Sequence, residues 1–406
     1  MIIGEAIADG NSSITTQEEQ FITKLDAEKD QFQKDLANYK ETFKRIEGFN
    51  NIETLNEFFK EAATLNSAIE ASRDKVETFN MREARLNQAK SEWVDFDELR
   101  TNFDPFYQLL STAHDSKRGL GEFSSQPLLQ ATFTYDEVEQ SVSGWQKTLF
   151  KLSKNLNENH PDASDAATEF KKKVDEFSLN LALMKCVMSE ALHDEDWNEI
   201  KKAIENPELD PQTITVSKFA EQNISGKLID IEEITNRAEK KFQLSKKLKA
   251  MKDEMKEFKL TNVPYKDTFV LKAYDEVNAK LDDQMVQTQA MLGSSNCVLK
   301  LRTDTRNWET KLTLMQDIII EINRCQKQWM YLEPIFSSED IGKTLGAELA
   351  AFQDVDNLWK TQMFNIDSEP GIFDLAERDS ILTWFIDANK KLERILRSLN
   401  DYLVEK

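Results

Sequence analysis

A glycine-lysine-threonine triplet at 342–344 has the residue types that end a phosphate-binding loop. Such a loop also needs a glycine five positions before the second one, after a strand, so that backbone N–H groups can surround a phosphate. This chain has Ser337 at that position, and the carboxylates of Glu339 and Asp340 would repel a phosphate. We therefore expect a turn between two helices, in which Ser337 or Ser338 is the cap, and no nucleotide.

Acidic residues also gather at 193–196, where the sequence reads His-Asp-Glu-Asp. A calcium loop needs acidic residues at alternate positions, a central glycine and a closing glutamate, and this segment has none of that pattern. Carboxylates do, however, stabilise the positive end of a helix dipole. The segment therefore predicts the first turn of a helix, and we expect no metal site.

Three cysteines are the remaining candidate nucleophiles: Cys186, Cys297 and Cys325. None lies in a Cys-x-x-Cys motif or near a histidine that could activate it. Their odd number and irregular spacing do not suggest a disulfide framework, which favours a reducing compartment. The sequence thus predicts no catalytic, cofactor-binding or metal-binding residues, and we do not expect an enzyme.

The composition limits the kinds of partner. The 406 residues carry 52 Lys and Arg against 73 Asp and Glu, a formal charge of −21. Binding to nucleic acid depends on clustered cations, so this balance argues against nucleic acid and against an anionic membrane surface. No stretch reaches the ~20 apolar residues that span a bilayer, and the first residues lack the pattern of a signal peptide. We expect a soluble intracellular protein.

The elements that would hold these side chains are almost all helical, since the chain has only 11 Gly and 8 Pro and 31% of its residues are charged. A capping-box spacing at Thr16 and Glu19 opens an apolar stripe that ends near Gly48. A second helix is predicted at about 52–89, antiparallel to the first. Residues 91–135 contain Pro105, two glycines and Pro127, which predicts a connecting region with short helices.

One change of period interrupts the helices. Apolar residues occur at every second position on both sides of 262–267, which predicts a β-hairpin at about 256–274. Three helices are predicted after it. Trp308 and Trp329 share a face of the first, while Trp359 and Trp384 fall on the other two. Large aromatic residues at such positions usually pack between helices, although a patch that docks on a partner is the alternative.

The predicted fold class is therefore all-α, an elongated array of helical bundles with one small β-hairpin. We expect three regions: a helical pair at 1–95, a helical connecting bundle at 96–215, and a third region at 216–406 that contains the hairpin. A single hydrophobic core stops growing near ~250–300 residues, which favours more than one bundle.

Residues 329–341 closely resemble a signature of dynein heavy chains, which reads W-L-Y-L-E-P-I-F-S-S-E-D-I, and they differ from it only at Met330. The positions that carry the resemblance are Trp329, Tyr331, Leu332, Glu333, Pro334, Phe336, Ser338, Glu339, Asp340 and, further on, Trp359. Further matches surround Gln326, the hairpin and residues 281–289. Residues 79–83 and 103–107 resemble the family more weakly. The sequence of the hairpin is most similar to that of axonemal dyneins.

The resemblance implies the end of a dynein tail and the first part of the linker, a helical rod that lies across a ring of six AAA+ modules. It implies a mechanical, non-catalytic role that couples ATP-driven changes of that ring to microtubule sliding. The implied partners are the AAA+ ring, other dynein heavy, intermediate or light chains, and the microtubule-based axonemal complex of a cilium or flagellum. No cofactor is implied for this segment.

A lever also needs a hinge, and we place the candidate hinge at Pro370 and Gly371 rather than at 334–346. The family's usual Leu-Pro-x-Glu after the signature is Leu-Gly-Ala-Glu at 345–348 here, so Gly346 replaces a proline that would fix the start of a helix. This departure keeps an alternative open. The chain starts with Met1 and could be a complete, stand-alone linker-like protein that acts as a structural or docking element of the axoneme.

Overall fold

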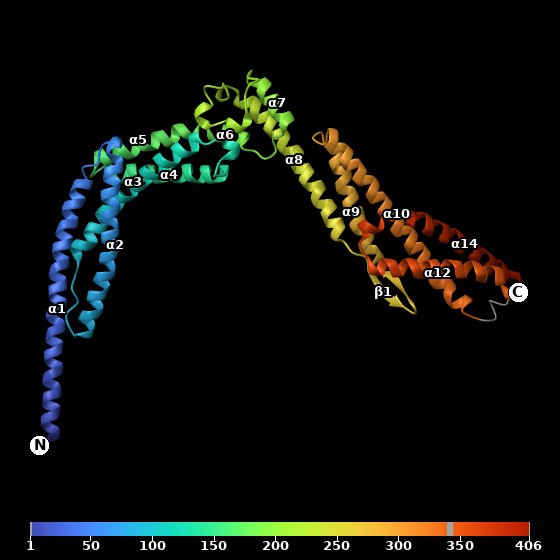
Figure 1. The fold of residues 1–406 in the computed structure, drawn as a ribbon, viewed down its shortest axis with the longest axis horizontal. Coiled ribbons are helices and arrows are strands. Elements are labelled where there is room, and N and C mark those ends of the chain that lie inside the picture. The colour runs from blue at the N-terminus through green and yellow to red at the C-terminus, as the bar shows by residue number, and fades with distance from the viewer. Residues whose placement is uncertain (1, 339–343, 406) are drawn as a thin grey trace. The chain divides into compact units, whose positions relative to one another are not determined.

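The computed structural model describes the backbone of residues 2–338 and 344–405, and the side chains of residues 16–338 and 344–404. Its contacts divide the chain into two compact units, Met1–Thr235 and Asn236–Lys406. Helices make up most of both units (Figure 1), so the expected all-α array is confirmed. Whether the chain further divides at 95 and 215 stays a prediction.

Unit 1 is built from α-helices joined by short 3-10 turns. Their bounds are α1 (Ile2–Ile46), η1 (Ile52–Thr54), α2 (Leu55–Arg85), α3 (Val94–Ser125), η2 (Leu128–Gln130), α4 (Tyr135–Leu156), α5 (Pro161–Ser178), α6 (Leu181–Val187), α7 (Asp194–Ala203), η3 (Pro211–Thr213), η4 (Val216–Lys218) and η5 (Ser225–Lys227). α4 and α5 lie side by side, and α3 packs against α2 and α4.

The capping box expected at Thr16 is not a helix start, because α1 already runs from Ile2 and passes through this position. No proline precedes Thr16 to stop the helix, so the Thr-x-x-Glu spacing occurs inside it. The paired helices themselves are confirmed. Buried residues of α1, such as Phe32 and Phe43, face α2 and α3 and form the apolar interior of the group.

The expectation of short helices at 91–135 is wrong, because α3 spans 32 residues without a break. Pro105 lies inside it, and a buried stripe holds the helix together on both sides of the proline: Phe96, Leu99, Phe103, Phe106, Leu110 and Ala113. Gly119 is not a breaker either. A Cβ there would lie 2.4 Å from the Trp145 ring of α4, so glycine permits a close approach of the two helices.

Unit 2 contains most of α8 (Leu228–Glu257), then β1 (Thr261–Tyr265), β2 (Thr268–Lys272), α9 (Tyr274–Gly293), α10 (Leu299–Phe336), α12 (Gly346–Ser368), α13 (Ile372–Leu375) and α14 (Ile381–Glu405). The predicted hairpin is confirmed as an antiparallel pair in which Tyr265 faces Thr268 across a two-residue turn. Lys266 in that turn has a φ of 52°, the left-handed conformation that tight hairpins need.

Sequence periodicity missed α9, so the described part of the chain has four long helices after the hairpin rather than the expected three. Its buried face contains polar members, Gln284 and Thr288, so the apolar stripe is interrupted. Both donate a hydrogen bond: Thr288 donates to the carbonyl of Gln284 (2.7 Å), and the side-chain nitrogen of Gln284 donates to Glu254 of α8 (2.6 Å). A helix face with hydrogen-bonded polar residues can still be buried, but its hydrophobic periodicity in the sequence is weaker than that of an apolar face.

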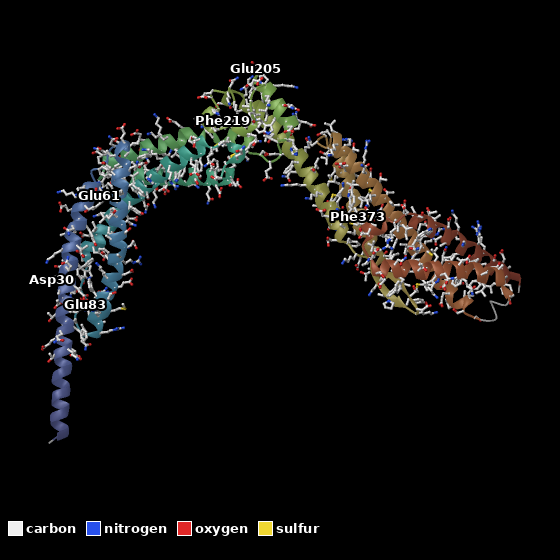
Figure 2. All side chains as sticks on the ribbon, viewed as in Figure 1. Asp30, Glu61, Glu83, Glu205, Phe219 and Phe373 are labelled. Atoms are coloured by element: carbon white, nitrogen blue, oxygen red, sulfur yellow. The ribbon has the colours of Figure 1, made fainter. Side chains whose placement is uncertain are left out.

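Figure 2 shows the described side chains of both units on the ribbon. Each unit has its own cluster of buried apolar residues, one that runs from Leu25 to Ile234 and one from Leu248 to Leu399. Among the described residues, no helix is long and apolar enough to cross a membrane.

Candidate functional site: the docked hairpin and residues 329–338

The predicted signature residues that the structure describes lie at the end of α10 or on α12, and they divide into buried and exposed faces. Trp329, Leu332, Phe336 and Trp359 are buried, Glu333 is half-buried, and Tyr331, Pro334 and Ser338 are exposed. The 3.6-residue period of the helix places the first group toward the core of unit 2. Glu339 and Asp340 lie outside the described residues.

Stacked aromatic rings connect three helices and the hairpin. The ring centroids of Trp329 and Trp359 are 5.4 Å apart at an interplanar angle of 22°, and Phe385 of α14 meets Trp359 edge-on at 6.2 Å. Tyr265 of β1 contacts Trp329 edge-on at 5.7 Å. Each such pair adds about 0.5–1.5 kcal/mol beyond the area it buries. This aromatic stack joins α10, α12, α14 and the hairpin.

Gln326, one helical turn before Trp329, completes the open edge of β2. Its side-chain oxygen accepts from the backbone N–H of Leu271 (2.7 Å), and its side-chain nitrogen donates to the Leu271 carbonyl (3.0 Å). These are the two hydrogen bonds that a neighbouring strand would make. A single amide therefore takes the place of a third strand and fixes the register of the hairpin against α10.

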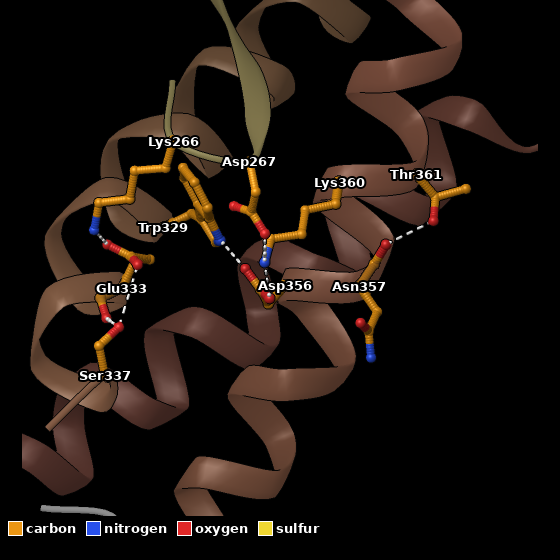
Figure 3. A network of polar contacts seen from close by, with 9 residues as sticks. All are labelled: Lys266, Asp267, Trp329, Glu333, Ser337, Asp356, Asn357, Lys360 and Thr361. Atoms are coloured by element: carbon orange, nitrogen blue, oxygen red, sulfur yellow. Dashed lines mark hydrogen bonds and ion pairs between the residues drawn. The ribbon is translucent and has the colours of Figure 1, made fainter. Parts of the chain in front are cut away.

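The turn of the hairpin is held by charges (Figure 3). Lys266 forms an ion pair with Glu333 of α10, while Asp267 lies 2.8 Å from the Nζ of Lys360 on α12. Lys360 also contacts Asp356 at 2.9 Å, and the other oxygen of Asp356 accepts from the Trp329 indole N–H (2.9 Å). The buried tryptophan and the exposed turn thus belong to one polar network.

The charges shift one another's protonation. Hydrogen bonding to Lys360 lowers the pKa of Asp267 from its ordinary 3.8. Hydrogen bonds to Asp267 and Asp356 raise the pKa of Lys360 above 10.5, and the hydrogen bond to Glu333 raises the pKa of Lys266. Lys266 and Asp267 are exposed to solvent and Lys360 is half-buried, so each pair stabilises the docked hairpin only modestly. Their combined effect is to specify where the turn sits.

The candidate hinge residues contact the segment that leads into β1. The carbonyl of Pro370 accepts from the N–H of Leu260 (2.8 Å), and the N–H of Ile372 donates to the carbonyl of Phe258 (3.3 Å). Gly371, between them, is buried. These contacts attach the joint between α12 and α13 to the base of the hairpin. Bending at Pro370 and Gly371 stays a prediction.

The two segments with possible ligand chemistry show no ligand set in the described part of the chain. Residues 342–343 lie outside it, and Ser337 is the C-cap of α10, with its Oγ 2.8 Å from the carbonyl of Glu333. Residues 194–196 form the first turn of α7, where Asp196 accepts from the N–H of His193 (2.9 Å). Among the described residues, no group of three metal-ligating side chains is close enough to hold an ion.

The weaker family-like segment at 79–83 forms a buried polar site in unit 1. Glu83 is fully buried and accepts from Lys29 of α1 (2.8 Å) and from the N–H of Ser91 (2.8 Å). Burial alone would raise the pKa of Glu83, but the hydrogen bonds from Lys29 and Ser91 leave that pKa below its ordinary value. Phe79, one turn earlier, packs against Phe32 at 5.8 Å. The site ties α1, α2 and the connection that leads into α3 together.

Sequence reasoning assigned no contacts to the residues that complete the main network: Lys266, Asp267, Asp356 and Lys360. A two-residue turn of opposite charges was visible in the hairpin pattern, but its partners lie 67 and 93 positions further along the chain. Gln326 did leave a signal. It is the polar member in the otherwise apolar stripe of α10, which is the pattern expected of a side chain that satisfies buried backbone groups.

A family model described as "Dynein heavy chain, N-terminal region 2" matches residues 96–406, well over half of the chain. This chain belongs to the dynein heavy chain family. The match begins in α3 and includes the hairpin, the aromatic stack and Gln326, while residues 79–83 precede it. The resemblance to axonemal dyneins is confirmed by relatives with that name.

Three of these relatives show how the similarity is distributed. Dynein axonemal heavy chain 3 of Homo sapiens is 30% identical over 359 residues, and that of Mus musculus is 29% identical over 360, in each case covering 88% of this chain and 8% of the relative. Dynein axonemal heavy chain 1 of Rattus norvegicus is 27% identical over 330 residues, 81% of this chain and 7% of the relative. The chain therefore spans less than a tenth of the length of these three relatives.

Proposed function

We propose that this chain is a mechanical, non-catalytic segment of an axonemal dynein heavy chain, the end of the tail with the first part of the linker. It would transmit ATP-driven changes of an AAA+ ring, carried elsewhere on the polypeptide, to the sliding of microtubules. The match to the N-terminal region of dynein heavy chains and the names of the relatives support this proposal. The same relatives support a place in the axoneme of a cilium or flagellum, beside other dynein chains.

The docked hairpin is the observation that best supports a mechanical role. A segment that transmits force must resist bending, and the aromatic stack around Trp329 and Trp359 joins three long helices through their buried faces. Gln326 and the ion pairs of Lys266 and Asp267 add a short sheet across two of these helices. Interactions that cross several elements oppose their sliding over one another, so unit 2 is suited to move as one body.

A lever also needs one place that yields. We propose that this place is the joint at Pro370 and Gly371, where α12 ends and the four-residue α13 begins. Bending there would have to break the hydrogen bonds that join Pro370 to Leu260 and Ile372 to Phe258. Because these bonds connect the joint to the base of the hairpin, movement of the joint and release of the hairpin would be coupled.

The size of the native polypeptide tests the proposal. An antibody against residues 1–50 should detect a band of several hundred kDa in isolated cilia, because the relatives are more than ten times as long as the matched region. A band near the 47.0 kDa of this chain would contradict it and would support a stand-alone structural or docking protein of the axoneme.

A second test uses the purified 406-residue chain, which should show no ATP hydrolysis above background. Turnover that disappeared with Lys343→Ala would place a nucleotide site in the chain.

A further inference from the structure

The negative charge of the chain is distributed unevenly. Residues 1–235 contain 26 Lys and Arg against 45 Asp and Glu, a net charge of −19, whereas residues 236–406 have 26 against 28, a net charge of −2. Within the second set, residues 237–259 reverse the sign, with nine cations against four acids. Residues 237–257 of this stretch lie in α8 and hold eight cations against four acids, a local charge of +4 in a strongly acidic protein. The acids at the start of α8 reduce the charge of the whole helix to +1.

The charges of α8 are also separated around its axis. Residues in a helix advance by ~100° each, so Lys249, Lys252 and Lys256 fall within an arc of ~60°. Asp253 and Glu257 lie ~40–140° away from those lysines around the helix axis. We call the three lysines the lysine strip. Lys252 and Lys256 are like charges at i, i+4, which costs stability in isolation, whereas Lys249 has Asp253 at the same spacing.

The neighbours of α8 contact Glu254, while in the lysine strip Lys249 and Lys256 are exposed and Lys252 is half-buried. Glu254 forms an ion pair with Lys280 and accepts from Gln284, both of α9. No carboxylate of the described residues lies within ion-pair distance of Lys249, Lys252 or Lys256. The ammonium group of Lys256 instead lies 5.6 Å from the centre of the Phe373 ring.

A fourth cation extends the strip. The Nζ of Lys311 lies 3.4 Å from the centre of the same Phe373 ring, so two ammonium groups share one aromatic side chain. Glu377 balances part of this charge through an ion pair with Lys311 at 2.5 Å. Hydrogen bonding to Lys311 lowers the pKa of Glu377, to which the charge of Lys256 also contributes. The positive field of α8 therefore reaches its neighbours in unit 2.

We propose that the lysine strip of α8 is a docking site for an acidic, extended peptide segment of a partner protein. The strip spans ~10 Å along the helix, at a rise of ~1.5 Å per residue. Its lysines follow one another at ~4.5–6 Å, close to the ~6.6 Å between alternate residues of an extended chain. A segment with an acidic residue at every second position can therefore meet the lysines in succession.

A short peptide suits this surface better than a nucleic acid or a membrane does. At physiological salt a charge acts over ~8 Å, so a peptide that covers only the strip meets mainly its positive field. A long polyanion or an anionic bilayer would extend over acidic residues as well, and the whole chain carries −21. The strip belongs to the same unit as the docked hairpin, but its charge pattern does not depend on the proposed linker role.

The test uses the 406-residue chain and a fluorescein-labelled peptide that alternates six glutamates with six serines. The charge-reversed variant is Lys249→Glu with Lys252→Glu, and the matched control is Lys240→Glu with Lys247→Glu. The control lysines lie on the same helix but away from the strip, have no ion pair among the described residues, and give the same change of net charge. Circular dichroism and the melting temperature confirm that both variants fold, and all three proteins are also mixed with vesicles that contain phosphatidylserine.

We expect the strip variant to bind the peptide about tenfold more weakly or worse, and the control variant to lose about twofold or less, because charge pairs at an interface depend on position. Added salt should weaken binding of the peptide by the unchanged chain, because salt screens charge pairs. We also expect none of the three proteins to bind the vesicles. Equal losses in the two variants, or no binding of the peptide by the unchanged chain, would overturn the proposal. Vesicle binding that the strip variant loses would assign the strip to a lipid surface instead.

Discussion

At the residue scale, this chain relies on large aromatic side chains at positions where helices meet. Trp308, Trp329 and Trp359 are almost fully buried, as their spacing predicted, whereas Trp384 is 42% exposed. Ser380, whose φ is 66°, marks the turn into α14, and Trp384 lies four residues later in the first turn of that helix. The next residue, Phe385, is buried. The helix can bury only one side of this pair, so the expectation that Trp384 packs in a helix interface is wrong.

Replacement of a tryptophan by alanine separates these two environments. Trp359→Ala should lower the free energy of unfolding by ~3–5 kcal/mol, because it removes the centre of the aromatic stack and leaves a cavity. Trp384→Ala should cost less than ~1 kcal/mol, since much of that ring is already in water. Urea denaturation followed by circular dichroism measures both values. Equal losses would show that the stack contributes no more than a surface tryptophan.

A pair of glycines in α3 gives a second comparison. Gly119→Ala should destabilise by ~1–3 kcal/mol, because the new Cβ would lie 2.4 Å from the Trp145 ring. Gly121→Ala on the same helix has no atom within 4 Å of its new Cβ and should stabilise by up to ~1 kcal/mol through helix propensity. The melting temperatures should therefore move in opposite directions. A stabilised Gly119→Ala protein would contradict the close approach of α3 and α4.

At the element scale, the hairpin is too small to be stable alone and owes its place to α10 and α12. Gln326→Leu should cost ~1–3 kcal/mol, because the N–H and carbonyl of Leu271 would be left buried without partners. Hydrogen–deuterium exchange at Leu271 should increase, while exchange in α14 stays unchanged. Gln353→Leu, on the exposed side of α12, is the control and should alter neither measurement. Unchanged protection at Leu271 would mean that the amide does not hold the strand.

The ion pair of Asp267 with Lys360 should make hairpin docking depend on pH. The pKa of Asp267 is lowered in the folded state, so its contribution is complete above the ordinary value of 3.8 and is lost as the pH falls through the lowered pKa. The pKa of Lys360 is raised, so its contribution is complete below 10.5 and is lost as the pH rises through the raised pKa.

The variant Asp267→Asn isolates this effect. It should be slightly less stable than the unchanged chain at pH 7, and the difference should shrink toward zero as the medium is acidified below the lowered pKa. Melting temperatures of both proteins across this range measure the difference. Asp275→Asn, in the first turn of α9, provides a comparison for a carboxylate that is not part of the network. A difference for Asp267→Asn that stayed constant with pH would exclude the ion pair as its source.

At the scale of the whole molecule, the buried apolar residues form two clusters, one in each unit. A domain with its own core can unfold as a unit, so calorimetry should resolve two transitions. Trp359→Ala should lower one melting temperature, and Phe106→Ala, in the core of α3, should lower the other. If either substitution lowered both transitions equally, the two cores would have to unfold as one.

The local patterns of the sequence were sufficient for much of this protein. The all-α class, the hairpin, the paired first helices and the buried faces around Trp329 all follow from hydrophobic period and turn residues, which act between near neighbours in the chain. The family resemblance at 329–341 likewise rests on the order of residues. Those features depend on short-range stereochemistry, so they are readable without a structure.

Only the tertiary structure decided which elements form hydrogen bonds and ion pairs with one another. α3 continues through Pro105, and α9 forms with a partly polar face, because packing and distant hydrogen-bond partners outweigh the local signals that argue against a helix. Gln326 completes β2 across 55 positions, and Asp267 pairs with Lys360 across 93. A contact of this kind depends on the distance between side chains in space, which period and composition do not contain. The lysine strip became visible in the same way, once the neighbours of α8 were known.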